Sequence, residues 1–215
     1  MINLIKYNLK IVENINYIAG WIFLLTIPVF VNFNLLNEAE FIKISEYVFT
    51  IIGLIWFTGL FSYEKKYNVS DIMKQVPNYR TIIFIVRIIF ILLSIFVGIT
   101  FLLLFAKMQN AEFCFIKILY SSIVNSFVLG MVGLLFSQLV SQTIIGYMLG
   151  LFYYYCEILT EGKITKYLYL FGLIYNIPNN KLFLMILGII LLLINFALYK
   201  SNYFFKINIG KLNRI

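Results

Sequence analysis

Six apolar stretches of about twenty residues constrain this chain more than any other feature of its sequence. They are separated by short polar connections and lie at residues 17–36, 44–62, 82–105, 117–137, 139–159 and 182–199. About 20 residues of helix cross the ~30 Å hydrocarbon core of a bilayer. Backbone groups in lipid need partners within their own segment, so each stretch should be helical. The sequence predicts an all-α integral membrane protein with six transmembrane helices, organised as a single domain over residues 1–215.

The composition agrees with a membrane protein and argues against an enzyme. Hydrophobic residues make up 62% of the chain and charged residues only 12%, whereas soluble domains have about 45–50% and about 25%. The chain has no histidine, which removes histidine-dependent triads, proton relays and imidazole metal sites. The fragment at 162–165, Gly-Lys-Ile-Thr, lacks the upstream glycine and the adjacent hydroxyl residue of a phosphate-binding loop. We expect no catalytic site, bound cofactor or metal on this chain.

The basic residues predict the orientation in the membrane. The net charge of +8 is better explained by loops resting on anionic headgroups than by nucleic acid. With the N-terminus inside, eleven Lys and Arg side chains fall on the cytoplasmic side and six outside. Cytoplasmic loops carry the excess of basic residues, so both termini are predicted to be cytoplasmic, in a multi-pass protein of the cell membrane. Arg87, inside the third span, should extend toward the cytoplasmic headgroups.

Two further segments are apolar without being long enough to cross. Residues 1–16 carry Ile2, Ile5, Leu9 and Val12 at helical spacing, which predicts an interfacial helix, the alternative being the start of the first span. The outer connection at 160–181 has an apolar middle, residues 167–177, that is too short to span. It is predicted to be a re-entrant or interfacial helical piece, ended near Pro178.

The cytoplasmic loop at 63–81 is predicted to hold a short amphipathic helix. Four apolar residues fall at the i, i+3, i+4, i+7 spacing of one helix face, namely Val69, Ile72, Met73 and Val76. Ser70 or Asn68 can cap this helix at its start, and Pro77 should end it because proline lacks the N–H group. The apolar face needs a cover, either the membrane surface or a partner protein.

Polar residues inside the predicted spans are few. Glu46 and Glu157 fall near span ends, where a charge is tolerated, so an acid relay is not expected. Asn125, Ser126 and Asn195 are the polar residues expected in the membrane interior. They are predicted to hydrogen-bond between helices, with a substrate path as the alternative interpretation. Cys114 and Cys156 form no CxxC pair, and the sequence leaves open whether they are joined.

The layout of the chain resembles an ABC-2-type transporter permease. Shared features are six spans in 215 residues, an N-terminal interfacial helix and a cytoplasmic loop after the second span. The loop carries the closest match: Glu64 directly after the span, an apolar turn through Ile72 and Met73, then Pro77 and Arg80 before the third span. The apolar outer segment before the last span also resembles the re-entrant outer helices of that family.

The resemblance implies the membrane half of an ATP-driven exporter. Two such halves, identical or paralogous, would pair around a path for an amphiphilic substrate such as a peptide, toxin or lipid, moved by alternating access. Separate ABC ATPase subunits, which carry ATP and Mg²⁺, would dock on the loop. The implied coupling residues are Glu64, Val69, Ile72, Met73, Val76, Pro77 and Arg80. The alternative is a stand-alone six-helix membrane binding or immunity protein, which would not need the loop helix.

Overall fold

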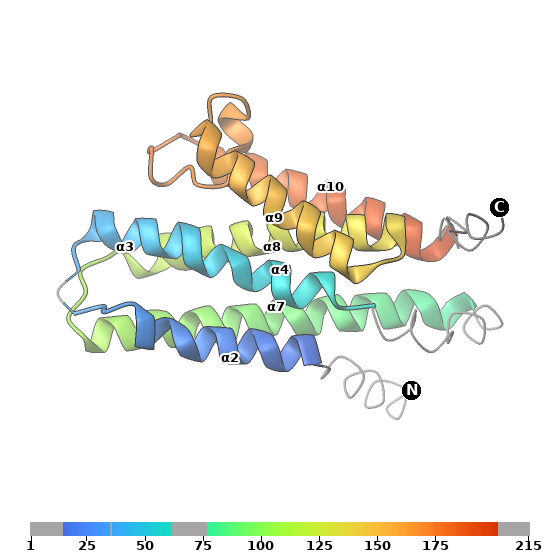
Figure 1. The fold of residues 1–215 in the computed structure, drawn as a ribbon, viewed down its shortest axis with the longest axis horizontal. Helices are drawn as coiled ribbons and strands as arrows, with labels where there is room; N and C mark the ends of the chain where they lie inside the picture. Colours follow the sequence, from blue (N-terminus) through green and yellow to red (C-terminus); the bar gives the residue numbers. More distant parts are fainter. Residues whose placement is uncertain (1–14, 35, 62–76, 202–215) are drawn as a thin grey trace, which may run out of the picture.

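The computed structural model describes residues 15–34, 36–61 and 77–201, and all regular structure within these ranges is helical. Successive long helices run in alternating directions along one bundle (Figure 1). The long elements are α2 (Ile15–Phe30), the continuous helix α3–η1–α4 (Glu38–Ile44, Ser45–Phe49 and Thr50–Thr58), α7 (Pro77–Met108), α8 (Phe115–Val140), α9 (Thr143–Thr160) and α10 (Asn180–Ser201). Residues 1–14 and 62–76, which carry most of the predicted interfacial helix and the predicted loop helix, lie outside the described residues.

Four of the helices are long and apolar enough to cross a membrane, as expected for a multi-pass protein. They are Glu38–Thr58, Thr81–Met108, Phe115–Val140 and Asn180–Lys200. The sequence prediction of six helical segments is confirmed, whereas membrane crossing by α2 and α9 stays a prediction. α2 has 16 residues, fewer than the ~20 that a span needs, and α9, which carries Glu157 and a run of tyrosines at 153–155, is not among the four.

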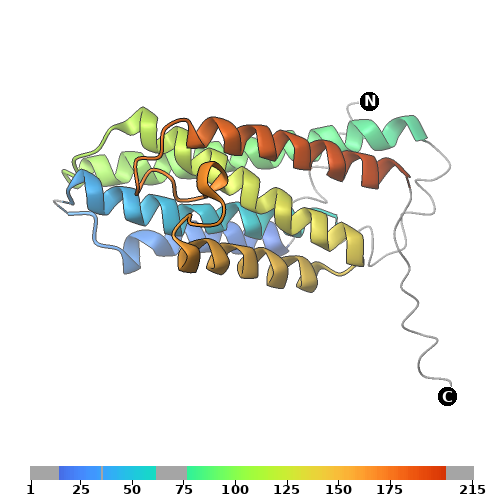
Figure 2. The ribbon, with the colours of Figure 1, turned by 90° about the horizontal axis from the view of Figure 1, so that it is seen from above.

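α8 is the central helix and packs against α4, α7, α9 and α10 (Figure 2). Small residues allow its backbone to approach its neighbours closely, as is common between membrane helices. A Cβ atom built on Gly53 of α4 would lie 1.8 Å from the carbonyl oxygen of Ser126 on α8. A Cβ on Gly146 of α9 would lie 2.5 Å from the carbonyl oxygen of Gly133. These contacts fix the register of α4, α8 and α9.

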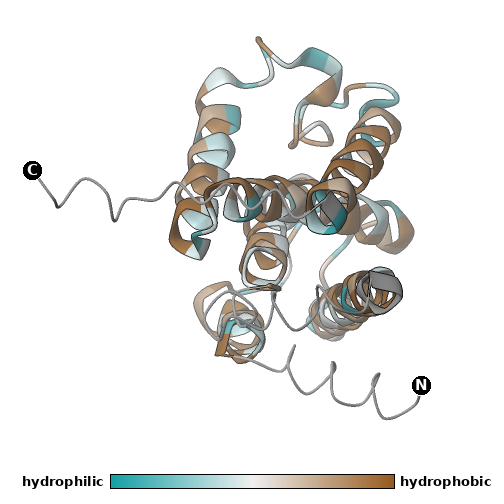
Figure 3. Cartoon of the chain, turned by 90° about the vertical axis from the view of Figure 1, so that its right-hand side faces the viewer, coloured by the Kyte–Doolittle hydropathy of each residue, from teal (hydrophilic) through white to brown (hydrophobic). Residues whose placement is uncertain are grey.

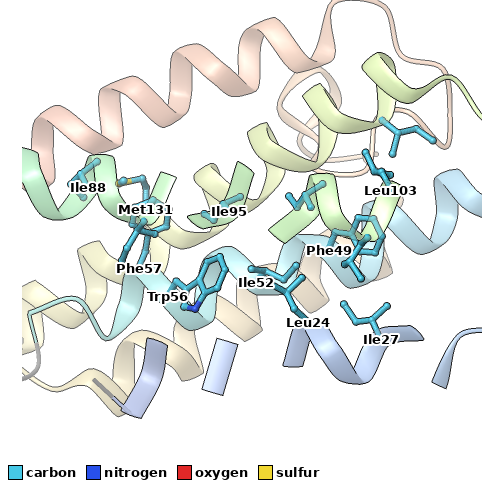
Figure 4. Packing of buried hydrophobic residues seen from close by; sticks show 14 of the residues in the cluster. Leu24, Ile27, Phe49, Ile52, Trp56, Phe57, Ile88, Ile95, Leu103 and Met131 are labelled. Atoms are coloured by element: carbon cyan, nitrogen blue, oxygen red, sulfur yellow. The ribbon is translucent and has the colours of Figure 1, made fainter. Parts of the chain in front are cut away.

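Large apolar side chains fill the space between α2, α4, α7 and α8 (Figure 4). Trp56 of α4 is central to this packing: its ring stacks on Tyr17 of α2 with centroids 5.7 Å apart. The Trp56 indole N–H also donates a hydrogen bond to the Tyr17 carbonyl oxygen at 3.1 Å. Lipid tails are as apolar as these side chains, so close packing and this interhelical bond hold α2 in place.

Hydrophobic residues predominate along the helices (Figure 3), and many large apolar side chains are exposed on them. On α7 seven exposed large apolar residues fall on one face of the helix, namely Ile85, Ile89, Leu93, Phe96, Val97, Phe101 and Leu104. A helix face of this composition suits contact with acyl chains.

Three observed features correct the sequence predictions. The second long helix begins at Glu38 rather than at residue 44, because the Asn37 side chain caps it by accepting the Glu40 N–H at 3.0 Å. Pro77 is the first residue of α7, which starts before the predicted residue 82; proline suits this position because its missing N–H has no partner there. Arg87 is fully buried instead of extending to headgroups.

Arg87 joins α7 to the end of α4. Its guanidinium donates to the Leu60 carbonyl oxygen at 3.5 Å and lies 5.5 Å from the centroid of the Phe61 ring. A buried guanidinium is tolerated only when its polar groups and its flat face find partners. The contact therefore ties the start of the third span to the end of the second.

A tight turn joins α8 to α9. α8 ends at Val140 and α9 begins at Thr143, with Ser141 in the left-handed conformation at φ 60°. Both cysteines are free thiols: Cys114 is exposed just before α8, and Cys156 is partly buried on α9.

Candidate functional site

The α9–α10 segment, residues 161–179, is irregular and yet packs into the bundle. Its only helical part is the short 3₁₀ turn η2 (Lys166–Leu168), so the predicted helical piece in this segment is wrong. Residues 169–171 at its centre are fully buried. Irregular backbone at such a place needs partners for its N–H and C=O groups, since water does not supply them. The segment ends with Asn176 and Asn179 in the left-handed region.

A buried ion pair lies beneath this segment. Glu46 belongs to η1, a π-helical turn inside the second long helix, and Lys181 lies in the first turn of α10. The Lys181 ammonium is 2.9 Å and 3.0 Å from the two carboxylate oxygens of Glu46. The two side chains are only 9% and 0% exposed. Charges so far from water are tolerated only when they are paired and their remaining hydrogen-bonding capacity is used.

Two polar side chains of α8 hydrogen-bond to this ion pair. Asn125 donates from Nδ2 to the Glu46 carboxylate at 2.9 Å and accepts from the Lys181 ammonium at 2.8 Å. The Ser121 hydroxyl donates to the same carboxylate. We call Glu46, Ser121, Asn125 and Lys181 the charged clasp. It joins the second long helix, α8 and α10 through one hydrogen-bond network.

The charged clasp also holds the backbone of the α9–α10 segment. The Leu173 N–H donates to Glu46 at 3.2 Å, and the Lys181 ammonium donates to the Leu170 carbonyl oxygen at 2.7 Å. Next to it, the Asn180 side chain donates to the carbonyl oxygens of Tyr167 and Tyr169, at 2.9 Å and 2.7 Å. Side chains from the helices thus replace the partners that a regular helix would have provided.

A second buried carboxylate, Glu157 of α9, holds the segment from the other side. It accepts the Thr165 hydroxyl at 3.1 Å and the Leu170 N–H at 3.4 Å, and it is also hydrogen-bonded to the Tyr153 hydroxyl. Its side chain is buried like that of Glu46. Within the described ranges no lysine or arginine forms an ion pair with Glu157. Neutral donors alone therefore stabilise this carboxylate.

The ring of Phe171, at the buried centre of the α9–α10 segment, lies in a cage of tyrosines. Its centroid is 4.8 Å from that of Tyr47, 5.4 Å from Tyr154 and 5.5 Å from Tyr169, each in an edge-to-face arrangement. Such pairs contribute about 0.5–1.5 kcal/mol each beyond the area they bury. The Tyr154 hydroxyl donates to the Tyr47 carbonyl oxygen at 3.1 Å, which links α9 to the second long helix. Tyr47, Tyr154 and Tyr169 are called the tyrosine cage.

The structure separates the three polar residues that were predicted to hydrogen-bond between helices, with a substrate path as the alternative. Asn125 is part of the charged clasp. Ser126 donates to the Phe49 carbonyl oxygen at 2.9 Å. Asn195 of α10 donates to the carbonyl oxygens of Met131 and Leu191, at 3.2 Å and 2.9 Å. Ser126 and Asn195 thus make the helix contacts that the sequence favoured.

Most of the predicted coupling residues lie outside the described part of the chain, namely Glu64, Val69, Ile72, Met73 and Val76. Pro77 and Arg80 belong to the first turn of α7.

The three charged residues of the site do not stand out in the sequence. The sequence pattern places Glu46 and Glu157 near span ends and Lys181 in an outer connection, but all three are buried. The early start of the second helix would have revealed Glu46, because the Asn37 cap signal places it two turns inside the helix. No local signal pairs Glu46 with Lys181, since their contact depends on how the helices pack.

A scan against protein-family models, a search of curated proteins and a search of solved structures each find no match to this chain. The likeness to ABC-2-type permeases therefore stays an expectation drawn from the layout and the loop residues. The charged clasp, the tyrosine cage and the irregular segment between them are the features from which a function can be argued.

Proposed function

We propose that this chain is the membrane permease subunit of an ATP-driven exporter, as its resemblance to ABC-2-type permeases implies. The observation that supports this best is the buried pair of Glu46 and Lys181, which holds an irregular segment across one end of the helix bundle. On the predicted orientation that end is the outer one. The α9–α10 segment would then be the outer gate, and the charged clasp its closed state.

A gating role explains the buried Glu46–Lys181 pair better than a purely structural role does. A buried ion pair is a poor way to gain stability, since well-packed apolar residues often do as well or better. Ionisable residues inside a membrane protein more often mark pathways and switches. The network of Glu46, Asn125 and Lys181 is bonded as a unit, so breaking one contact weakens the others. Such an element has two discrete states, which gating requires.

The fold offers a mechanical route from the cytoplasmic loop to this gate. The loop joins the end of α4 to the start of α7, and Arg87 ties these two helices together near it. The second long helix then runs unbroken from Thr58 back to Glu46. In the proposed cycle, closure of the ATPase subunits moves the loop helix as a lever. The second long helix carries the movement to Glu46 and releases the backbone of the α9–α10 segment from the charged clasp, while Glu46 and Lys181 stay paired.

Co-purification tests the proposal. The tagged chain, extracted from its native membrane in mild detergent, should retain an ABC ATPase subunit. The double change Ile72→Asp and Met73→Asp should abolish this retention, because it places two charges on the predicted docking face. Gln75→Asp, off that face, is the matched control and should retain the ATPase. Retention that is equal in both variants, or absent from the wild type, would contradict the proposal.

A stand-alone membrane binding or immunity protein is the second candidate. One observation favours it: no residue of the charged clasp or the tyrosine cage comes from the cytoplasmic loop. These residues lie on the second long helix, α8, α9, α10 and the α9–α10 segment. Replacing residues 63–76 with a Gly/Ser linker of equal length separates the two. Full activity in the host would favour the binding protein, and loss of activity with retained folding would favour the exporter.

A further inference from the structure

Glu157 poses a question that gating alone does not answer. The residue is 2% exposed, and the partners of its carboxylate are the hydroxyls of Thr165 and Tyr153 and one backbone N–H, that of Leu170. A buried carboxylate is stabilised more by a cation than by neutral donors, because an opposite charge adds a direct Coulomb attraction that is strong away from water. In this structure Glu46 has an ammonium partner and Glu157 has none among the described residues.

Some of the groups around Glu157 belong to the helices, and the others belong to the α9–α10 segment. Two members of the tyrosine cage belong to helices, Tyr47 to η1 and Tyr154 to α9, whereas Tyr169 belongs to the α9–α10 segment; Tyr153 lies one turn before Glu157 on α9. The Phe171 ring, the Leu170 N–H and the Thr165 hydroxyl come from the α9–α10 segment. If the segment moves away, the helices keep an aromatic-walled space with one uncompensated negative charge. Lys181 is part of α10 and stays with Glu46.

We propose that the α9–α10 segment fills a binding site for a cationic peptide that carries an aromatic residue, and that this peptide displaces it. The inference rests on the proposed transport function, for which it names the class of cargo. The segment presents what such a peptide would present: an aromatic ring to the tyrosine cage and hydrogen-bond donors to Glu157. A basic side chain next to an aromatic one would make the same contacts with a full charge.

Charge and ring chemistry together determine the selectivity. An ammonium or guanidinium group would neutralise Glu157 and would also be attracted by the faces of Tyr153 and Tyr154. An anionic ligand would meet the uncompensated carboxylate and be repelled. An uncharged aromatic ligand would fill the cage but would leave Glu157 without the donors that the segment now supplies, which carries a desolvation cost.

The backbone contacts favour a peptide over a simple aromatic amine. In the closed state Glu46 accepts an N–H from Leu173, while Lys181 donates to the carbonyl oxygen of Leu170. A peptide that turns as residues 170–173 do has N–H and C=O groups at this spacing and can take over both contacts. An aromatic amine has neither a peptide N–H nor a peptide C=O and would leave the charged clasp without these partners.

The test uses the full-length chain in lipid nanodiscs, without any ATPase, and isothermal titration with N-acetyl-lysyl-phenylalanyl-lysine amide. Phe171→Ala removes the ring that competes for the tyrosine cage and should tighten binding about tenfold, because the binding-competent state becomes more populated. Tyr167→Ala, an exposed aromatic residue of the same segment, is the matched control and should bind like the wild type. Adding Glu157→Gln to Phe171→Ala should weaken binding at least about tenfold through the lost charge.

Three results would overturn the proposal. The first is that Phe171→Ala binds the peptide no more tightly than Tyr167→Ala. The second is equal binding of a matched peptide with glutamate in place of both lysines. The third is equal binding of phenethylammonium, which has the ring and the cation without a peptide bond. If Phe171→Ala does not fold, Phe171→Leu takes its place, and absence of tightening there is equally decisive.

The outcome is independent of the exporter proposal. The titration contains no ATPase subunit, so failure to bind the peptide would leave ATPase co-purification unaffected. Loss of co-purification would likewise leave a positive titration standing, as expected for a stand-alone peptide-binding protein.

Discussion

The Lys181 ammonium contacts both carboxylate oxygens of Glu46, at 2.9 Å and 3.0 Å, although the two residues stand 135 positions apart in the chain. The contact brings the start of the last helix against the second long helix, and Asn125 of α8 bonds to both partners. Three helices and the α9–α10 segment thus depend on one buried pair of charges.

Removing one partner of this pair should be more harmful than removing both. Glu46→Gln leaves a buried ammonium without its counter-charge, and Lys181→Met leaves a buried carboxylate; each should cost about 3–5 kcal/mol of unfolding free energy. In the double variant neither charge remains, so much of the loss should be recovered. Chemical unfolding in mixed detergent micelles, read out by tryptophan fluorescence, measures all four proteins of this double-mutant cycle.

Ser126→Ala provides the control, because its hydroxyl bonds to the Phe49 carbonyl oxygen outside the clasp. It should lose only about 0.6–2 kcal/mol. If the costs of the two single changes simply add in the double variant, the pair is not coupled and cannot act as a unit that opens.

The apolar segments of the sequence predicted the helices well, since a stretch of this length and hydrophobicity has no alternative to a helix in lipid. Their ends were less predictable because polar side chains determine them. The Asn37 side chain starts the second long helix six residues before the apolar run begins at 44. This shift moves Glu46 from a span end into the interior of the bundle.

The charged clasp itself could not have been predicted from the local pattern. Lys181 lies between Asn180 and Leu182 in a stretch that reads as an exposed connection. Its burial follows from the way in which residues 169–171 fold back into the bundle and need backbone partners. The helical piece predicted for residues 167–177 failed for the same reason: side chains from Glu46, Asn180 and Lys181 satisfy the backbone and make a helix unnecessary.

Tyr169→Phe should stabilise the protein at neutral pH. The Tyr169 side chain is fully buried, and its hydroxyl has no hydrogen-bond partner. An unsatisfied buried hydroxyl costs about 1–3 kcal/mol, and removing it while keeping the ring avoids that cost. We expect a gain of about 1 kcal/mol in the unfolding free energy, measured as for the clasp variants. A loss of stability would mean that the hydroxyl has a partner in the membrane.

The same residue makes stability depend on alkaline pH. Burial raises the pKa of the Tyr169 hydroxyl above its ordinary value, with smaller contributions from Tyr47, Tyr175, Glu157 and Glu46. Its contribution to stability is therefore constant below the pKa of about 10 that tyrosine has in the unfolded chain. It falls as the pH rises through the higher pKa of the folded state. The advantage of Tyr169→Phe over the wild type should accordingly grow above about pH 10.

Thiol labelling should establish the predicted orientation. Cys114 is exposed in the connection between α7 and α8, on the side that the count of eleven basic residues against six places outside. In a Cys156→Ser background, a membrane-impermeant maleimide added to intact cells should therefore modify Cys114. Gln142→Cys, placed in the exposed turn between α8 and α9 of a chain without native cysteines, should react only after the membrane is permeabilised. The reverse pattern would put the α9–α10 segment on the cytoplasmic side, where it could not act as an outer gate, and labelling of both positions in intact cells would mean that α8 does not cross the membrane.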